Sequence, residues 1–104
     1  MDLVTFEQWV ENFYVKRGWS QYGPFIRVNF LLEETGEVAR VVRSLEIGRD
    51  RPDEATKNEE ELKTELKEEL GDVLSNLIIL AKQYDLDLQD IMDAHTKKLS
   101  ERFE

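Results

Sequence analysis

Two short acidic runs interrupt segments that otherwise have the apolar periodicity of helices. The first is EETGE at residues 33–37 and the second is EELGD at residues 68–72. Because apolar residues recur at helical spacing on both sides of each run, both runs are expected to lie on long helices. These apolar positions are Phe30, Leu31, Val38, Val41 and Leu45 in the first segment, and Leu62, Leu66, Val73, Leu77 and Leu80 in the second. The sequence therefore predicts an all-α fold with acidic side chains on its inward faces.

Each acidic run presents a pair of carboxylates on one face. Glu34 and Glu37 are three residues apart and share one side of a helix. Glu69 and Asp72 share a side in the same way. If the two segments form an antiparallel hairpin that turns between residues 48 and 58, each pair lies roughly 16 Å from its end of the turn. We therefore expect the four carboxylates to meet at one level of the hairpin.

Such a group of carboxylates needs a counter-charge. Carboxylates that converge in a partly desolvated groove repel one another, and a bound cation relieves this repulsion. Magnesium prefers oxygen ligands, keeps several waters and is commonly shared with the phosphates of a substrate. The sequence therefore predicts a site for Mg²⁺, with Mn²⁺ as the alternative, together with a polyphosphate.

Composition narrows the possible partners. The chain has 104 residues, which we expect to form a single domain over residues 1–104. A formal net charge of −9 argues against nucleic acid or an anionic membrane as the partner. The absence of cysteine rules out thiolate metal sites and disulfides and fits a reducing compartment. Since no apolar run approaches the ~20 residues of a membrane helix and no basic leader is present, we expect a cytoplasmic protein.

Capping and turn residues set the boundaries of four expected helices. They span residues 5–17, 24–48 and 58–83, and the last begins at residue 87. The expected caps are Thr5 with Gln8, either Thr56 with Glu59 or Asn58 with Glu61, and Asp87 with Asp90. Residues 49–58 are charged and contain a proline, and are expected to form a solvated linker. The third helix is apolar on more than one face after residue 72, which predicts a homodimer or a dimer of dimers.

Aromatic side chains occur on the first helix and in the turn that follows it. The first helix carries an apolar stripe of Phe6, Trp9, Val10, Phe13 and Tyr14. Its aromatic rings could offer a stacking surface for a nucleobase, but core packing is the commoner use of such a stripe, and we expect it for Trp9 and Phe13. Trp19 and Tyr22 lie in the turn before Pro24. They either contact a substrate or cover the end of the bundle, and we give the two interpretations equal weight.

Further polar residues are candidates for contacts with a substrate. Arg27 lies one heptad before Glu34, where it either contacts a phosphate or pairs with an acid. Asn76 follows Asp72 by one turn and serves either as a substrate contact or as a structural amide. Three cations of the last helix are also candidates for contacts with phosphate: Lys97, Lys98 and Arg102. No Glu-x-x-His pair is present, which argues against a di-iron bundle.

The two acidic motifs resemble those of the MazG-like, all-α nucleoside triphosphate pyrophosphohydrolases. Members of this family carry EExxE followed, after a spacer, by ExxD, and this chain has EETGE at residues 33–37 and ELGD at residues 69–72. Pro24 before the second helix and the run DVL at residues 72–74 are also similar, so the resemblance spans most of the chain. Leu99 is a departure, because several relatives have asparagine at the corresponding place.

The resemblance implies both an architecture and an activity. The architecture is an antiparallel bundle of about four helices, completed by oligomerisation. The activity is magnesium-dependent conversion of an NTP or dNTP to the monophosphate and pyrophosphate, as in cleaning of the nucleotide pool. The implied metal ligands are Glu34, Glu37, Glu69 and Asp72. Glu33 is then expected to orient or deprotonate the attacking water, and Glu68 to face solvent. The alternative is a non-catalytic helical module that binds a nucleotide or a protein.

Overall fold

The elements of the fold are known from a computed structural model, which describes residues 1–103. Four α-helices and one short 3₁₀ turn follow one another along the chain. They are α1 (Leu3–Arg17), η1 (Trp19–Gln21), α2 (Pro24–Ile47), α3 (Glu59–Lys82) and α4 (Leu88–Phe103). No strand occurs within residues 1–103. The all-α fold predicted from the sequence is confirmed.

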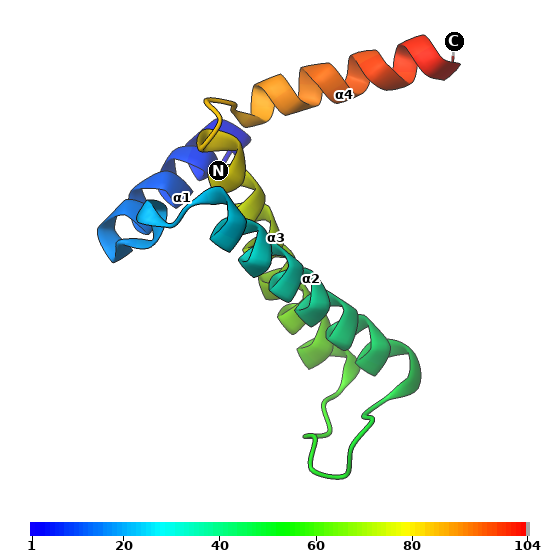
Figure 1. Cartoon of the computed structure of the whole chain (residues 1–104). Coiled ribbons are helices and arrows are strands. Elements are labelled where there is room, and N and C mark those ends of the chain that lie inside the picture. Colours follow the sequence, from blue (N-terminus) through cyan, green and yellow to red (C-terminus); the bar gives the residue numbers. More distant parts are fainter. Residues whose placement is uncertain (104) are drawn as a thin grey trace.

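Helices α2 and α3 form a long antiparallel hairpin (Figure 1). Each has 24 residues, which corresponds to a length of about 36 Å. The two helices pack against each other more extensively than any other pair of elements. Val41 of α2 and Leu62 of α3 are buried in the half of the hairpin that lies nearer the connecting loop. The hairpin expected from the spacing of the acidic runs is therefore present.

The boundaries of the hairpin follow from local chemistry. Pro24 occupies the first turn of α2, where its missing N–H costs no helical hydrogen bond. Gly48 ends α2 with a φ of 81°. Asn58 and Glu61 form the capping box of α3: the Asn58 side chain accepts from the Glu61 N–H at 2.8 Å, and the Glu61 carboxylate accepts from the Asn58 N–H at 3.3 Å. The second of the two predicted caps for this helix is thus the one found.

The beginning of α1 differs from the prediction. Its N-cap is Asp2, whose carboxylate accepts a hydrogen bond from the Thr5 N–H at 2.8 Å, and the helix starts at Leu3. The capping box predicted for Thr5 and Gln8 is therefore wrong. Aspartate is among the strongest N-caps, and Asp2 lies three residues before Thr5, so it sets the start of the helix first.

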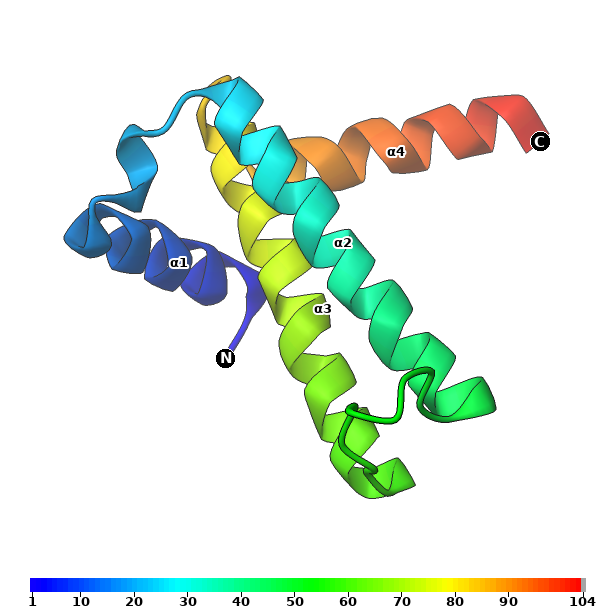
Figure 2. The same ribbon diagram turned by 60° about the horizontal axis from the view of Figure 1, so that its bottom comes forward.

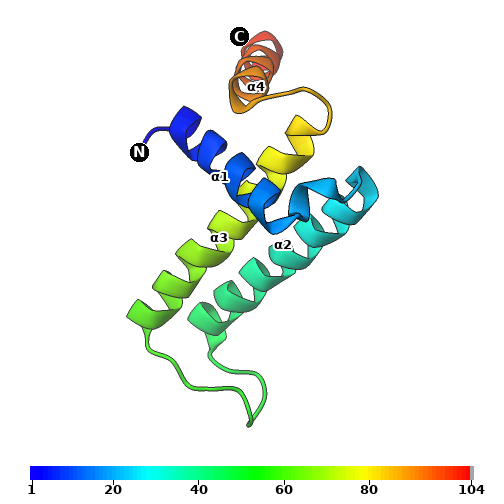
Figure 3. The ribbon, with the colours of Figure 1, turned by 90° about the vertical axis from the view of Figure 1, so that its left-hand side faces the viewer.

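Helix α1 crosses α3, as Figures 2 and 3 show. The central cluster of apolar side chains lies at this crossing. Val10 of α1 and Ile78 of α3 have no exposed surface, and Ile79 is 4% exposed. Other apolar side chains pack around them: Phe6, Tyr14, Leu74 and Leu88. This small cluster fixes α1 against the C-terminal half of α3.

The prediction that Trp9 and Phe13 belong to the core needs correction. Trp9 is 53% exposed, and Phe13 is only partly buried and lies outside the central cluster. Their rings stack on each other with centroids 5.0 Å apart. The physical reason is that α3 covers the side of α1 that carries Val10, whereas the Phe13 ring packs on Trp19 of η1 and the Trp9 ring packs on Phe13.

Helix α4 runs away from the hairpin, as Figures 1 and 2 show. Its first turn is fixed by Glu7 of α1, a buried carboxylate that accepts a hydrogen bond from the Leu88 N–H at 2.8 Å. Farther along, its large apolar side chains remain exposed to 40% or more: Ile91, Met92, Leu99 and Phe103. Within residues 1–103, no helix combines the length and apolar character needed to cross a membrane.

Candidate metal centre

Three carboxylates meet where α2 and α3 lie side by side. Glu34 of α2 and Glu69 and Asp72 of α3 each offer an oxygen within 4.8 Å of the others. The antiparallel pairing brings them to one level, as the spacing of the two runs predicts. Glu34 and Glu69 are partly buried and Asp72 is exposed, so the cluster opens to solvent on one side.

The electrostatics of the cluster are unfavourable for the metal-free chain. Burial is the largest effect that raises the pKa of Glu34, followed by the negative charges of Asp72 and Glu69. The pKa of Glu69 is raised by burial and then by the charges of Asp72 and Glu37. In both cases the surroundings disfavour the ionised form, as expected where like charges share a site.

The chemistry of this donor set fits a hard divalent cation. All three groups are carboxylates, which suit Mg²⁺ and Mn²⁺ better than softer metals. The open side leaves room for water or for phosphate oxygens, which magnesium usually keeps among its ligands. A divalent cation would also offset the repulsion that, after burial, contributes to the raised pKa values of the two glutamates.

Glu37, the fourth predicted ligand, lies outside this three-carboxylate group. Its Oε2 accepts a hydrogen bond from Nε of Arg40 at 2.9 Å, and 43% of its side chain is exposed. Arg40 also donates from Nη2 to Glu65 of α3 at 2.7 Å. The structure thus brings together three of the four predicted ligands, while Glu37 is paired with an arginine that sequence reasoning missed. The i,i+3 spacing of Glu37 and Arg40 was the available signal.

The remaining acidic residues of the two runs are exposed. Glu33 precedes Glu34 and Glu68 precedes Glu69, and both side chains reach solvent. The expectation that Glu68 faces solvent is met. Glu33 stays a predicted contact for the attacking water.

An aromatic pocket adjoins the three carboxylates. Its volume is about 340 Å³, and Glu34 and Asp72 form part of its wall. The remaining lining residues are Tyr14, Trp19, Tyr22, Arg27, Phe30 and Asn76. Trp19 stands edge-on to Tyr14, with ring centroids 5.3 Å apart, and Tyr22 lies 6.2 Å from Phe30. Sequence reasoning named Trp19 and Tyr22 but missed Tyr14 and Phe30, which it assigned to helical stripes.

Arg27 and Asn76 tie this pocket to α3. Arg27 is 3% exposed; its Nη1 donates to Asn76 Oδ1 at 2.8 Å and its Nη2 to the Trp19 carbonyl at 2.6 Å. The Asn76 amide in turn donates to the Asp72 carbonyl at 2.8 Å. The Arg27 guanidinium also lies against the rings of Tyr14 and Phe30. Burial lowers the pKa of Arg27, and its hydrogen bonds within the described residues fix Trp19 beside the acidic cluster.

The three predicted cations of α4 lie elsewhere. Lys97, Lys98 and Arg102 line a shallow surface of α4 with Ala94 and Glu101. Since α4 leaves the hairpin after its first turn, this chain alone does not bring them to the carboxylates (Figure 1). His95 is exposed on the same helix.

Comparisons with known proteins point to one family. Residues 27–104 match the MazG nucleotide pyrophosphohydrolase domain. The chain is 58% identical over 104 residues to the uncharacterized protein YvdC of Bacillus subtilis (strain 168), an alignment that covers 100% of this chain and 98% of that protein. The crystal structure of YPJD from Bacillus subtilis, described as a candidate pyrophosphatase, matches with a TM-score of 0.70 and 26% sequence identity. That match covers 94% of each chain.

Proposed function

Since this chain belongs to the MazG nucleotide pyrophosphohydrolase family, we propose that it hydrolyses a nucleoside triphosphate, or a deoxynucleoside triphosphate, to the monophosphate and pyrophosphate. The observation that carries the proposal is the meeting of Glu34, Glu69 and Asp72 at the wall of an aromatic pocket. One compact region thus offers oxygen ligands for a metal and flat rings for a nucleobase.

The carboxylates are assigned to the metal and to the attacking water. Glu34, Glu69 and Asp72 hold magnesium, and Glu37 is the fourth ligand. When bound, magnesium supplies charge neutralisation for the triphosphate and lowers the pKa of a bound water. Glu33, next to Glu34 on α2, orients or deprotonates the water that attacks the α-phosphorus.

The aromatic pocket is assigned to the nucleoside. Trp19 and Tyr22 are each about 40% exposed, so their rings are open to a ligand. Stacking of a base on an aromatic ring typically contributes about 1–3 kcal/mol per base. Arg27 and Asn76 are buried residues of the pocket wall. They hold Trp19 in place through the hydrogen bonds described above.

A second copy of the chain is proposed as the partner of α4. Exposed apolar side chains along most of this helix need a partner surface, and burying them against the same surface of a second copy gives a homodimer. In such a dimer, or in a dimer of dimers, Lys97, Lys98 and Arg102 are candidates for phosphate contacts across the interface. We further propose that residues 1–104 act as a single domain, in the cytoplasm, where nucleoside triphosphates occur.

Pyrophosphate release from a panel of nucleoside and deoxynucleoside triphosphates tests the proposal. Activity is expected with Mg²⁺ or Mn²⁺ and not with EDTA. The variant Asp72→Asn should lower turnover by at least about 100-fold, because it removes a charged metal ligand. The matched control is Glu68→Gln, which neutralises an exposed acid on the same helix and should retain near-normal activity.

The alternative, a non-catalytic nucleotide-binding or protein-interaction module, gives a different result in that assay. Metal-dependent binding of a nucleotide without release of pyrophosphate would favour it. The absence of both would contradict the proposed function altogether.

A further inference from the structure

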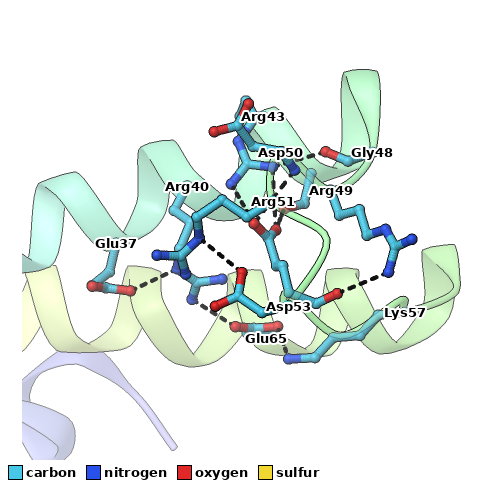
Figure 4. A network of polar contacts seen from close by, with 12 residues as sticks. Glu37, Arg40, Arg43, Gly48, Arg49, Asp50, Arg51, Asp53, Lys57 and Glu65 are labelled. Carbon is cyan, nitrogen blue, oxygen red and sulfur yellow. Dashed lines mark hydrogen bonds and ion pairs between the residues drawn. The ribbon is translucent and has the colours of Figure 1, made fainter.

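A chain of ion pairs leads from Glu37 to the loop of the hairpin, as Figure 4 shows. Arg40 of α2 bridges two acids: its Nε donates to Glu37 at 2.9 Å and its Nη2 to Glu65 at 2.7 Å. The second oxygen of Glu65 accepts from Lys57 Nζ, in the loop before α3, at 2.7 Å. One guanidinium thus links a predicted metal ligand to α3, and Glu65 in turn links it to the loop.

The two ends of the Arg40 bridge differ in strength. Glu65 is 16% exposed, and both of its oxygens are engaged by cations. Its pKa is lowered, first by the hydrogen bond from Lys57 and then by that from Arg40. Glu37 is 43% exposed and has a single contact with Arg40, through one oxygen. Glu37 is therefore the end of the bridge that can leave while Arg40 stays on Glu65.

This pairing bears on the metal centre directly. Glu34, Glu69 and Asp72 already have oxygens within 4.8 Å of one another, and Glu37 is absent from that group within the described residues. Yet Glu37 lies one helical turn from Glu34 on the same side of α2, within reach of the cluster. A change of side-chain conformation, without movement of α2, is the simplest route by which Glu37 joins the other ligands.

We propose that Arg40 is a positioning residue that holds Glu37 away from the metal centre, and that a metal ion must draw Glu37 from Arg40 to gain its fourth carboxylate. The inference rests on the proposed function, since it takes Glu37 as a metal ligand. Its consequence is that metal binding and the Glu37–Arg40 ion pair compete for the same side chain. The ion pair sets the metal affinity without contacting the metal.

The expected size of the effect follows from exposure. The Arg40 and Glu37 side chains are 37% and 43% exposed, and ion pairs of this kind are weak. Removing the pair by Arg40→Gln is therefore expected to tighten Mn²⁺ binding by about two- to fivefold. Arg40→Lys keeps the charge but lacks the two separate donor nitrogens that span both acids. Its ammonium should stay with Glu65, and binding should still tighten by about twofold.

Titration of Mn²⁺ into the nucleotide-free protein, followed by electron paramagnetic resonance of the free ion, measures this affinity. The matched control is Arg43→Gln, which removes an arginine one turn farther along α2 that pairs with Glu54 instead. A gain for Arg40→Gln and Arg40→Lys, with Arg43→Gln unchanged, supports the proposal. An equal gain for Arg43→Gln and Arg40→Gln, or no gain for Arg40→Lys, would overturn it, because plain removal of charge would then explain the data.

A double-mutant cycle isolates the part that passes through Glu37. In a Glu37→Gln background, Arg40→Gln should lose at least half of its effect on Mn²⁺ affinity. An undiminished effect in that background contradicts the proposal. Wild-type protein that binds no Mn²⁺ would instead refute the metal centre itself, so failure of this inference and failure of the proposed function are told apart. Far-ultraviolet circular dichroism of each variant verifies that the helices are intact.

Discussion

The surroundings of Glu34 disfavour the ionised form of its carboxyl group. Burial, and then the charges of Asp72 and Glu69, raise its pKa above the ordinary value of 4.5. An acid with a raised pKa in the folded state binds its proton more tightly there than in the unfolded chain. The stabilisation that comes from this tighter proton binding is therefore fully present below pH 4.5 and is lost as the pH rises through the raised pKa. Ionisation of Glu34 as the pH rises therefore lowers the stability of the metal-free chain.

Replacing Glu34 by glutamine should consequently stabilise the metal-free protein at pH 7. The expected gain is below about 1 kcal/mol, because the group is partly exposed and water screens the repulsion. The gain should shrink as the pH is lowered toward 4, where the wild-type carboxyl also carries a proton. Urea unfolding in EDTA between pH 4 and pH 8 measures this, and a gain of the same size at both ends of the range would contradict the assignment.

Arg27 is a buried cation that is held by neutral groups. Arg27→Met should destabilise the chain by about 2–4 kcal/mol, because the Asn76 amide oxygen and the Trp19 carbonyl both lose their donor. The control is Arg17→Met, which removes a guanidinium that lies 5.2 Å from the Phe13 ring. That change should cost about 1 kcal/mol or less. Urea midpoints compare the two variants, and similar losses would contradict the structural role of Arg27.

The position of a single side chain was predictable from the sequence only where the geometry of its own helix determines that position. Helical spacing placed Glu34 and Arg27 on the same side of α2, and both line the aromatic pocket. The burial of the Arg27 guanidinium depends on Tyr14 and on the Trp19 carbonyl, whose positions the pattern of α2 does not encode. The Glu37–Arg40 pair has the i,i+3 spacing of a helical ion pair, but spacing alone does not decide whether Glu37 turns toward Arg40 or toward Glu34.

At the level of elements, two glycines on α2 have opposite roles. Gly48 ends the helix with a φ of 81°. Any residue with a side chain would be strained in this backbone conformation. Gly36 lies inside the helix, and a Cβ built there would meet nothing within 4 Å. The same substitution should therefore have opposite effects at the two positions.

Gly48→Ala is expected to destabilise the protein by about 1 kcal/mol. Gly36→Ala is expected to stabilise it by about 0.5–1 kcal/mol, because alanine favours the helix interior. Thermal unfolding of the two variants in EDTA measures both effects in the metal-free protein. A loss of stability for Gly36→Ala would show that another chain or segment covers that position.

Helix boundaries were predicted well wherever a cap and a periodic pattern agree. Asn58 with Glu61 and Asp87 with Asp90 form the expected hydrogen bonds. The start of α1 was misplaced because Asp2 lies before the periodic pattern begins, so the pattern alone does not indicate it. Its identity as a strong N-cap residue, about one turn before the pattern, was the available signal.

At the scale of the whole molecule, α4 points away from the hairpin and leaves its apolar side chains exposed. If α4 packs on a second copy, Leu99→Asp should weaken association by at least about tenfold, since it places an unpaired charge in an apolar contact. Ala94→Asp introduces the same residue roughly 140° around α4 from Leu99 and should weaken association much less. Analytical ultracentrifugation measures both, and a monomeric wild-type protein would contradict the proposed dimer.

The arrangement of the whole chain was predictable in part. Antiparallel pairing of α2 and α3 followed from the two acidic runs, and cross-helix contacts such as Arg27–Asn76 and Arg40–Glu65 agree with it. The crossing of α1 over α3 was not predictable, because it depends on contacts between Val10 and residues almost seventy positions away. The direction of α4 depends on the Glu7 side chain and was equally hidden.

The position of a bound metal tests the central claim most directly. Crystals grown with Mn²⁺ and measured at its absorption edge locate the ion by anomalous scattering. The account predicts a peak between Glu34, Glu69 and Asp72, at about 2.0–2.4 Å from an oxygen of each. No peak at these carboxylates, or a peak only at other acidic groups of the surface, would contradict it.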